Sequence, residues 1–510
     1  MKKWILRSIT GFVLCGTQLT GNAFATQARV QALGGGTNSA PAHFYSLEDD
    51  RDIFHFPSQV NTHKNTGFVD LYDLSEPAVG AKNASDASDP SAGGIYGFNN
   101  GASVGLFVNR DDNGIRTTDF VGTFTATPTP LENPFDLFAS LKRGIFTFGA
   151  SLHIANGKDD SESTSDATTT TITSGTAAAP ILGDQTSASS NKKSSLKKLV
   201  LGTTVDLGPT PNSYLDVSFG YTSFEALNES RTRTVTFNNA SPTAANADFD
   251  TTDTFLKEKA ESDGIFSLMA RAFLPVQGNP TLRFVPAAYI AFQDSRFNSS
   301  STTTVTNTNT AAGTTTQTLP VPGANNPEQP NQLKFQESRY GLGLGLNRTT
   351  PNNMVAVNLN IEAWKMKKRR EVNTGATGID NSGPKSSGIP VSIKAALESK
   401  IGKPWLIGRV GIKQTLFGRQ RSDTRTTAAT TPSSTVTTPV FETSVSSTSQ
   451  TDSNIGDNDP DFISLGFGII KGNFSLDAVI VESNLFSGTY LLSGNKANLL
   501  AAISAKLKLD

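Results

Sequence analysis

From Phe146 to the end of the chain, strand-like segments come in pairs joined by very short turns, and long Ser/Thr/Asn-rich insertions separate the pairs. In the clearest pair, Tyr340 to Leu346 and Val355 to Ala363, every second residue is apolar and the residues between are small or polar. This alternation, with short turns on one side and long loops on the other, is typical of outer-membrane proteins. It predicts an all-β fold, a transmembrane antiparallel up-and-down β-barrel.

Counting the alternating segments gives about 16 strands, and an even number places both chain ends on the periplasmic side, as bacterial barrels require. The first four segments alternate least clearly, so a barrel of about 14 strands is the alternative. The segments are Phe68–Leu74, Gly93–Phe98, Ser103–Val108, Pro134–Leu141, Phe146–Ile154, Leu199–Leu207, Leu215–Phe224, Phe266–Leu274, Leu282–Phe292, Tyr340–Leu346, Val355–Trp364, Val391–Ile401, Leu406–Phe417, Ile463–Ile470, Phe474–Val481 and Leu499–Leu509.

The long insertions all fall on the same side of this alternation, and they have no pattern that would form a core. We therefore expect them to be solvent-exposed outer loops. Because threonine favours strands, the alternative is additional β structure above the membrane. The insertions are Asn156–Lys197, Glu225–Asp263, Asn298–Asn331, Lys367–Ile389 and Gly418–Pro460.

The N-terminus has the pattern of a secretory signal peptide. Lys2 and Lys3 precede an apolar stretch, and Ala23-Phe24-Ala25 is an A-x-A cleavage site, so residues 1–25 are expected to be removed. The apolar stretch is too short for a membrane anchor, and no later stretch has the ~20 apolar residues of a transmembrane helix. Cys15, the only cysteine, would leave with the signal, so the mature chain has no thiol for a disulfide or a metal.

Composition fits a barrel and argues against several other classes. The formal net charge is -1, which gives no general attraction to nucleic acid. Hydrophobic residues make up only 36% and glycines number 44, which suits a barrel because only one face of each strand must be apolar. The expected partners are outer-membrane lipid, the barrel-assembly machinery and a small solute. No cofactor is expected, and the oligomeric state is left open.

The strand charges fall almost entirely on the face opposite the apolar one, which would be the barrel lumen. A charge facing lipid at mid-membrane costs ~2–4 kcal/mol, so a barrel requires this segregation. The charges either tune the selectivity of a channel or pair with one another and brace the wall. Both signs occur, so no preference for anions or cations follows. The lumen or selectivity candidates are Arg271, Arg283, Arg339, Glu362, Lys394, Glu398, Arg409, Lys413 and Asp477, and the first three could form a basic ladder.

Aromatic residues near the strand ends are explained by the interfacial girdles of outer-membrane barrels, with stacking of a substrate as the alternative. They are Tyr221, Phe292, Tyr340, Trp364 and Phe417.

Motifs for catalysis and metal binding are weak. The histidines lack zinc-ligand spacing, and the acidic stretch Asp452–Asp459 lacks the spacing of an EF-hand loop, which favours a solvated loop. No nucleophile elbow is present. His153 beside Asp159 and Asp160 is the strongest catalytic arrangement, and it is a poor one. We expect no enzyme, no catalytic residue and no metal site.

Three short motifs near the mature N-terminus carry a family resemblance: Ala28–Gly35, the pair Asp49-Asp50, and Phe54-His55-Phe56-Pro57. The region is similar to the N-terminus of barrels of the long-chain fatty-acid transporter (FadL-like) superfamily. There an Arg–Leu/Met–Gly-Gly segment and a double Asp precede an Asn-Pro-Ala motif, in place of which this chain has Phe56-Pro57-Ser58.

The resemblance implies that the N-terminal segment folds into the barrel as a plug, and that relatives either move hydrophobic compounds or act as shuttles in secretion. Apolar residues such as Ile53 in a segment without alternation agree with burial. The expected division is therefore a signal peptide at 1–25, a periplasmic or lumen-plug segment at 26–64 and the barrel at 65–510. The plug candidates are Asp49, Asp50, Phe54, Phe56 and Pro57.

The sequence favours an integral, multi-pass β-barrel of the outer membrane of a Gram-negative bacterium, a porin or facilitated transporter of a small solute, with a hydrophobic solute among the options. The alternative is a non-transporting surface or secretion/assembly scaffold that acts through its outer loops. A soluble secreted β-rich adhesin is the third class. The fold alone does not decide among these functions.

Overall fold

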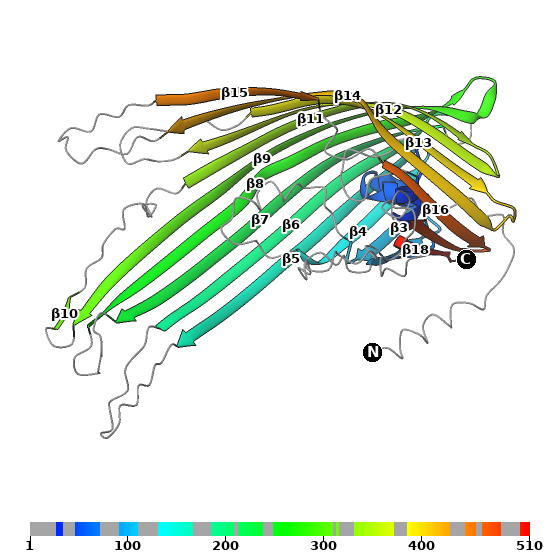
Figure 1. Cartoon of the computed structure of the whole chain (residues 1–510). Helices are drawn as coiled ribbons and strands as arrows, with labels where there is room; N and C mark the ends of the chain where they lie inside the picture. Colours follow the sequence, from blue (N-terminus) through cyan, green and yellow to red (C-terminus); the bar gives the residue numbers. More distant parts are fainter. Residues whose placement is uncertain are drawn as a thin grey trace, which may run out of the picture.

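The computed structural model describes residues 27–33, 46–71, 91–110, 131–166, 185–208, 213–237, 248–309, 313–315, 331–371, 385–428, 444–454, 462–480 and 500–509. Within these ranges one antiparallel sheet of 18 strands closes on itself, because β1 pairs with both β18 and β2 (Figure 1). All strands except β10 and β15 form the ring, which is a closed barrel of 16 strands.

The strands are β1 (Thr66–Leu71), β2 (Ser91–Gly97), β3 (Ala102–Val108), β4 (Glu132–Arg143), β5 (Phe146–Asp166), β6 (Gln185–Asp206), β7 (Tyr214–Phe237), β8 (Asp248–Val276), β9 (Asn279–Asn309), β10 (Gly313–Thr315), β11 (Asn331–Thr349), β12 (Asn353–Glu371), β13 (Lys385–Lys400), β14 (Leu406–Ala428), β15 (Ser444–Asn454), β16 (Phe462–Lys471), β17 (Phe474–Ile480) and β18 (Leu500–Lys508). The described helices are short: α2 (Gln27–Ala32), η1 (Asp50–Phe54) and η2 (Pro57–Asn61). No described helix is long and apolar enough to cross a membrane.

Each of the sixteen predicted segments corresponds to one strand of the ring, so the fold prediction is confirmed and the count of about 14 is wrong. The predicted ends at Leu74, Val481 and Leu499 lie outside the described residues. The short turns gather at one end of the barrel. The start of β1 and the end of β18 lie at the same end, where the Lys508 and Leu509 amides donate to the carbonyls of Asn473 and Asn65.

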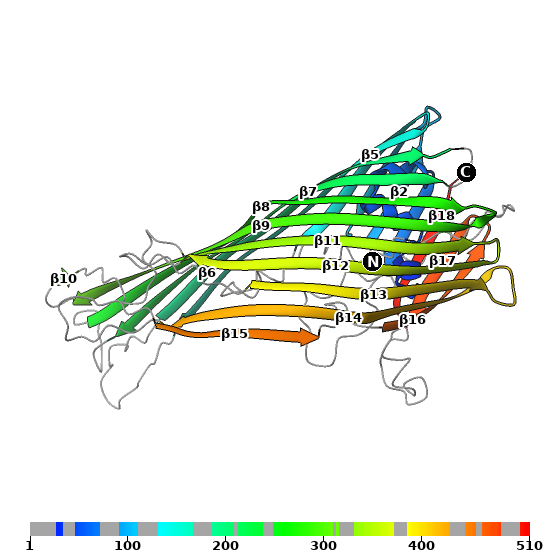
Figure 2. The ribbon, with the colours of Figure 1, turned by 90° about the horizontal axis from the view of Figure 1, so that it is seen from above.

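The strands from β5 to β14 continue far beyond the rest of the ring, and this corrects the prediction of loops (Figure 2). β8 has 29 residues and β9 has 31, and they remain paired up to Asp248 and Asn309. The described parts of the long insertions are therefore largely β structure, the alternative raised above. Neighbouring insertions satisfy each other's backbone groups, and their many threonines favour extended backbone.

The outer face of the ring carries a band of exposed apolar side chains, which water-soluble proteins rarely show at this size. An aromatic belt bounds the band on the side of the extended strands. Its residues are adjacent in register on β7, β8, β9 and β11: Tyr221 lies opposite Phe266, Phe266 opposite Phe292, and Phe292 meets Tyr340 at 5.9 Å. Tyr96, Phe98, Phe146 and Phe148 are exposed near the short turns. These contacts fit interfacial girdles.

Trp364 does not belong to this outer belt. On β12 it follows the inward parity of Asn358 and Glu362, and a Cβ added to inward-facing Gly388 would meet its indole at 2.6 Å. The girdle assignment was wrong for Trp364 because it relied on distance from the strand end and ignored which face the residue occupies.

Candidate functional site

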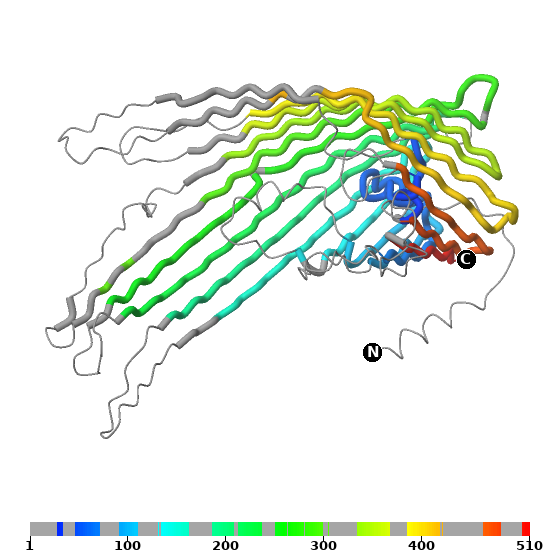
Figure 3. The backbone as a smooth tube through the Cα atoms, viewed as in Figure 1, coloured from blue at the N-terminus to red at the C-terminus, as the bar shows by residue number. Residues whose placement is uncertain are grey.

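The described N-terminal segment, residues 27–33 and 46–64, lies inside the ring near the short turns (Figure 3). α2 packs against β14, β16, β17 and β18, whereas η2 packs against β3 to β6. The segment thus contacts strands from both ends of the chain. The signal peptide, His43 and the residues between the two parts of the segment lie outside the described residues.

One buried ion-pair network fastens α2 to the wall. The Arg29 guanidinium donates to Glu398 at 2.6 Å, and Arg409 donates to the same carboxylate at 2.7 Å and to Asp477 at 2.6 Å. Arg409 and Asp477 have side chains at 0% exposure, so both carboxylates are needed to compensate the two guanidinium groups. Arg29 comes from the resemblance motif, and the other three members of the network, Glu398, Arg409 and Asp477, were predicted lumen residues.

Asp50, the first residue of η1, has two basic partners, a lysine and a histidine. Its carboxylate accepts from Lys506 on β18 at 2.6 Å and lies 2.8 Å from the His63 Nδ1. Burial alone would raise the pKa of Asp50, but the His63 and Lys506 charges outweigh it and lower that pKa. Asp50 is therefore a carboxylate that ties the segment to the strand that closes the barrel.

Asp52 shares a wall arginine with a strand carboxylate. Arg271 on β8 donates to Asp52 at 2.6 Å and to Asp216 on β7 at 3.0 Å, and its guanidinium lies 4.7 Å from the Phe56 ring centroid. Gln59 of η2 also donates to Asp216, at 2.7 Å. The segment completes the hydrogen bonding of this part of the wall.

Glu48 joins two further strands. Its carboxylate accepts from Arg283 on β9 at 2.6 Å and from the Tyr214 hydroxyl on β7 at 2.8 Å. Although burial opposes ionisation, the hydrogen bond from Arg283 lowers the pKa of Glu48. The three consecutive acids Glu48, Asp49 and Asp50 therefore have separate surroundings.

Apolar side chains of the segment fill the space between the ion pairs. Phe54 packs in a buried cluster with Ile53, Val60 and strand residues of β1 to β4, and the Arg110 guanidinium lies 3.9 Å from its ring centroid. Phe56 packs with Met269, Ala287 and Tyr289. The sequence motif therefore contributes both charge and aromatic packing to the lumen.

Wall glycines let the backbone of the segment approach closely. Gly149 and Gly202 face each other on β5 and β6, and a Cβ on Gly149 would overlap the backbone of Pro57 and Ser58. A Cβ on Gly202 would lie 2.9 Å from the Pro57 ring. Pro57 is thus seated where the wall has no side chains, a use of glycine that strand alternation does not reveal.

The predicted lumen charges all lie on inward positions of their strands, and each of the three arginines of the supposed basic ladder has a carboxylate partner. Arg339 bonds Glu337 at 2.5 Å and Glu362 at 3.2 Å, in addition to the pairs of Arg271 and Arg283 described above. Lys394 and Lys413 are buried directly opposite each other on β13 and β14. These arginines therefore pair with carboxylates inside the barrel, as the second interpretation above predicts. A role in selectivity stays a prediction.

The sequence reasoning missed an inward cluster on β4 and β5. Arg110 donates to Asp136 at 2.8 and 2.7 Å, and the His153 Nδ1 lies 2.9 Å from the same carboxylate. His153, considered above together with Asp159 and Asp160, is 2% exposed and lies against Asp136. The inward parity of Asp136 on β4 was the available signal.

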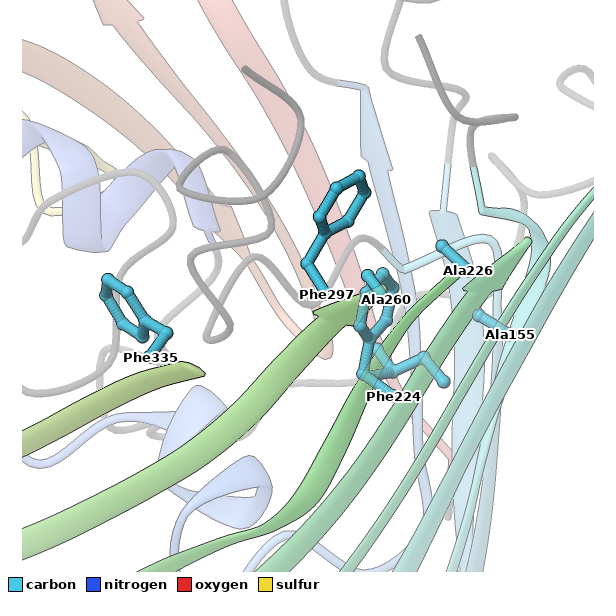
Figure 4. Close-up of a cluster of buried hydrophobic side chains, with 7 residues drawn as sticks. Ala155, Phe224, Ala226, Ala260, Phe297 and Phe335 are labelled. Atoms are coloured by element: carbon cyan, nitrogen blue, oxygen red, sulfur yellow. The ribbon is translucent and has the colours of Figure 1, made fainter. Parts of the chain in front are cut away.

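Above the aromatic belt, the inner wall carries an apolar cluster that crosses six consecutive strands of the ring (Figure 4). Inward residues at matching register contribute one after another: Leu196 lies opposite Phe224, and Ala260 opposite Phe297. The cluster consists of Ala155, Leu196, Phe224, Ala226, Ala260, Phe297 and Phe335, with Leu131, Ile265 and Met366 packed against it. It forms a buried apolar cluster on the inner wall of the barrel, on the side of the extended strands.

Among the described residues, no group of three or more His, Cys, Asp or Glu side chains is placed to hold a metal ion. The acidic stretch considered for calcium lies partly outside these residues, because positions 455–461 are not described.

No family model and no curated protein matches the chain. Among solved structures, it is similar to a TodX monoaromatic hydrocarbon channel deltaS2 mutant, with 9% identity over 96% of this chain and 99% of that chain and a TM-score of 0.32. It is also similar to the Ralstonia pickettii toluene transporter TbuX, with 10% identity over 96% and 99% and a TM-score of 0.28. The FrpB iron transporter from Neisseria meningitidis (F3-3 variant) has 8% identity over 90% and 83% and a TM-score of 0.21.

The closed barrel is established by the strand pairing of this chain itself.

Asp49 makes docking of the segment sensitive to pH. Burial raises its pKa from 3.8 to about 8, against the attraction of Arg29 and with Asp52 and Asp50 adding repulsion. Between pH 3.8 and about 8, the Asp49 carboxyl therefore holds a proton while the segment lies against the barrel wall and loses it when the segment is released. Its stability relative to release should fall as pH rises from 3.8 towards 8, by up to ~1.4 kcal/mol per pH unit.

Thiol labelling of Ser46→Cys, a fully buried position, measures release. We expect Asp49→Asn, which keeps a cap acceptor for the Arg51 amide, to label more slowly than the parent at pH 8 and equally at pH 4. Glu48 and Asp50 have the opposite pH dependence, because their stabilising contributions are lost as pH falls through their lowered pKa values. Dividing the labelling rate of the Asp49→Asn variant by that of the parent at the same pH cancels this contribution. Equal labelling at both pH values would contradict the assignment to Asp49.

Proposed function

We propose that the chain is an outer-membrane transporter of a small hydrophobic solute in a Gram-negative bacterium, and that its N-terminal segment acts as the plug. The apolar band with its aromatic belt supports placement in a membrane. Because outer-membrane insertion follows secretion, the signal peptide predicted at residues 1–25 belongs to the same proposal.

The observation that carries this proposal is the inward apolar cluster around Phe224, Phe297 and Phe335. A water-filled porin has a polar interior, and apolar side chains in contact with water gain nothing there. The rings of this cluster are 2–7% exposed, so an apolar solute that enters from outside would take over contacts that now bury them. The cluster therefore favours a hydrophobic solute over an ion or a sugar.

The contacts of the segment favour a plugged carrier over an open porin. Ion pairs join it to strands β8, β9, β13 and β18, and the arginine or lysine of each pair is buried, so release would leave several buried charges without these partners. Releasing one buried partner costs ~3–5 kcal/mol, which keeps the docked state dominant.

Planar-bilayer conductance and solute uptake by proteoliposomes test this function together, with the mature chain refolded and folding checked by heat-dependent gel mobility. We expect few or no ion steps and accelerated uptake of a small aromatic hydrocarbon. Large stable ion steps with no effect on hydrocarbon uptake would instead establish an open porin.

Phe335→Asn should lower hydrocarbon uptake at low solute concentration about tenfold. Losing roughly half of the burial of one aromatic side chain is worth ~1.4 kcal/mol of solute binding, or a factor of ten. Phe255→Asn is the matched control, because Phe255 is an exposed phenylalanine of β8 on the outer part of that strand. An equal loss in both variants, or in neither, would contradict a role of the apolar cluster in uptake.

The second candidate function, a surface scaffold, is favoured by the outer extension of β7, β8 and β9. Cross-strand ion pairs stiffen it: Arg231 bonds Asp253, and Lys257 lies 2.7 Å from Glu229. Shortening β8 and β9 together beyond Phe255 separates the two functions. If the chain is a transporter, this deletion leaves hydrocarbon uptake intact. If it is a scaffold, the chain shows no uptake that depends on it, and the deletion abolishes binding of its partner.

A further inference from the structure

On three strands of the ring, the outward column of apolar residues ends in a base where the strand reaches a short turn. On β11 the exposed Leu346 is followed, at the next outward position, by Arg348. The outward columns of β16 and β4 end in the same way, in Lys471 and Arg143. All three bases are exposed, and we call them the terminal bases. The exposed apolar residues that lead to them are Leu342, Leu344 and Leu346 on β11, Ile463 and Phe467 on β16, and Leu137 on β4.

The terminal bases have no acidic neighbour in register. Each lies opposite apolar residues of the adjacent strands: Val355 and Leu282 for Arg348, Phe474 for Lys471 and Phe146 for Arg143. None of the three forms an ion pair with any residue in the described ranges. Their charge is therefore left on the outer surface of the barrel.

The acidic side chains nearest the short turns all lie at inward positions of the described strands. They are Asp206, Asp216, Glu398 and Asp477, of which the first lies 3.0 Å from Lys142 and the other three are buried. In the extended part of the barrel, by contrast, outward bases of β7 and β8 have the carboxylate partners described above. Unpaired positive charge on the outer face is thus a feature of the short-turn end.

Aromatic side chains are exposed at the same height. Besides those of β2 and β5 described above, the Trp405 side chain is 45% exposed. It lies next to the end of β16, because the Ile470 amide donates to the Trp405 carbonyl at 2.8 Å, and Lys471 is the following residue. Aromatic residues of membrane proteins gather at the level of the lipid headgroups. A base that ends an apolar column at this level lies where acyl chains meet phosphate.

We propose that the terminal bases bind the phosphate groups of anionic phospholipids in the leaflet at the short-turn end, with the acyl chains lying along the apolar columns. The inference rests on the membrane placement proposed above and is independent of the solute. Neighbouring strands are about 4.8 Å apart, so Arg348 and Lys471, four strands apart in the ring, are separated by roughly 19 Å along the wall. Each terminal base therefore holds its own lipid.

Phosphatidylglycerol is the probe, added to the refolded mature chain in a mild detergent, with binding measured by native mass spectrometry. The variant R143Q/R348Q/K471Q should bind it about fivefold more weakly per site, because one basic residue near an anionic lipid surface contributes about that factor. R143K/R348K keeps the charge and should bind as the parent does. Phosphatidylcholine with the same acyl chains carries no net charge, and the parent should bind it as weakly as the glutamine variant binds phosphatidylglycerol.

The matched control is K64Q/K142Q/K400Q, which removes three exposed bases of the same end that lie at inward positions. It should change phosphatidylglycerol binding less than twofold. Unchanged binding by R143Q/R348Q/K471Q would overturn the proposal, and so would an equal loss in the control, which would mean a general effect of charge. Displacement of the lipid by an equal concentration of inorganic phosphate would also overturn it, because the site would then be one for free phosphate.

Failure of the membrane placement itself gives a different result. The parent would then bind neither phospholipid and would not enter phosphatidylcholine liposomes, and both proposals would fall. If the parent enters the liposomes but binds the two phospholipids equally, only the role of the terminal bases is wrong.

Discussion

Replacing Gly149 with alanine is expected to lift η2 from the wall and make the barrel conduct ions. The new Cβ would overlap the backbone of Pro57 and Ser58, and backbone atoms cannot rotate away as a flexible side chain can. Overpacking of this kind costs about 1–3 kcal/mol, and here the cheapest relief is movement of the segment, because β5 is paired along both edges. At 2 kcal/mol the fraction of open barrels rises about 30-fold.

Single-channel recording measures the effect as the fraction of time that current steps are seen. Gly94→Ala is the matched control: it adds the same methyl group to a strand glycine, and its nearest neighbour, the Thr66 carbonyl oxygen, lies 3.5 Å away in ordinary contact. If Gly149→Ala folds and is as silent as Gly94→Ala, the segment does not close the pore by resting on this glycine.

The periodic part of the fold could be predicted from the sequence because period-two alternation reports directly which residues lie on the outer face of the ring. Even the weak segment at Phe68 corresponds to a strand, in which that residue is buried and Val69 is exposed. The same alternation predicted that Arg271 and Glu398 face the lumen, and both are buried at inward positions of their strands. The extended strands were missed because, beyond the apolar band, the residues of both faces are polar and apolar alternation disappears, as in the Ser301–Thr304 stretch of β9.

The partners of the lumen charges could not be predicted, since they come from a segment with no period of its own. Arg271 bonds Asp52 across 219 positions and Lys506 bonds Asp50 across 456. Register rules connect neighbouring strands but do not place a short helix within the lumen. The contact of Pro57 with Gly149 and Gly202 could not be predicted either, because a glycine in a strand does not indicate which segment packs against it.

Removing the carboxylate of Glu398 is expected to be the most damaging single change in the lumen. Glu398→Ala leaves Arg29 without its ion-pair partner and Arg409 with only Asp477, and both guanidinium groups are almost completely buried. An unpaired buried charge of this kind costs ~3–5 kcal/mol, which corresponds to a factor of at least 100 in the release of α2. The expected result is rapid proteolysis at Arg29 in a barrel that still shows heat-dependent gel mobility.

Two further variants show whether the buried charge is the cause. Asp206→Ala breaks the exposed pair with Lys142 at 3.0 Å and should change protection by less than ~1 kcal/mol. Adding Arg29→Met to Glu398→Ala removes one stranded charge, so the double variant should label at a buried Ser46→Cys no faster than Glu398→Ala alone. Additive effects would mean that Arg29 and Glu398 act independently, since coupled residues in one buried network give non-additive changes. Non-additivity would show that the segment is held at this ion pair, between the N-terminal motif and strand β13.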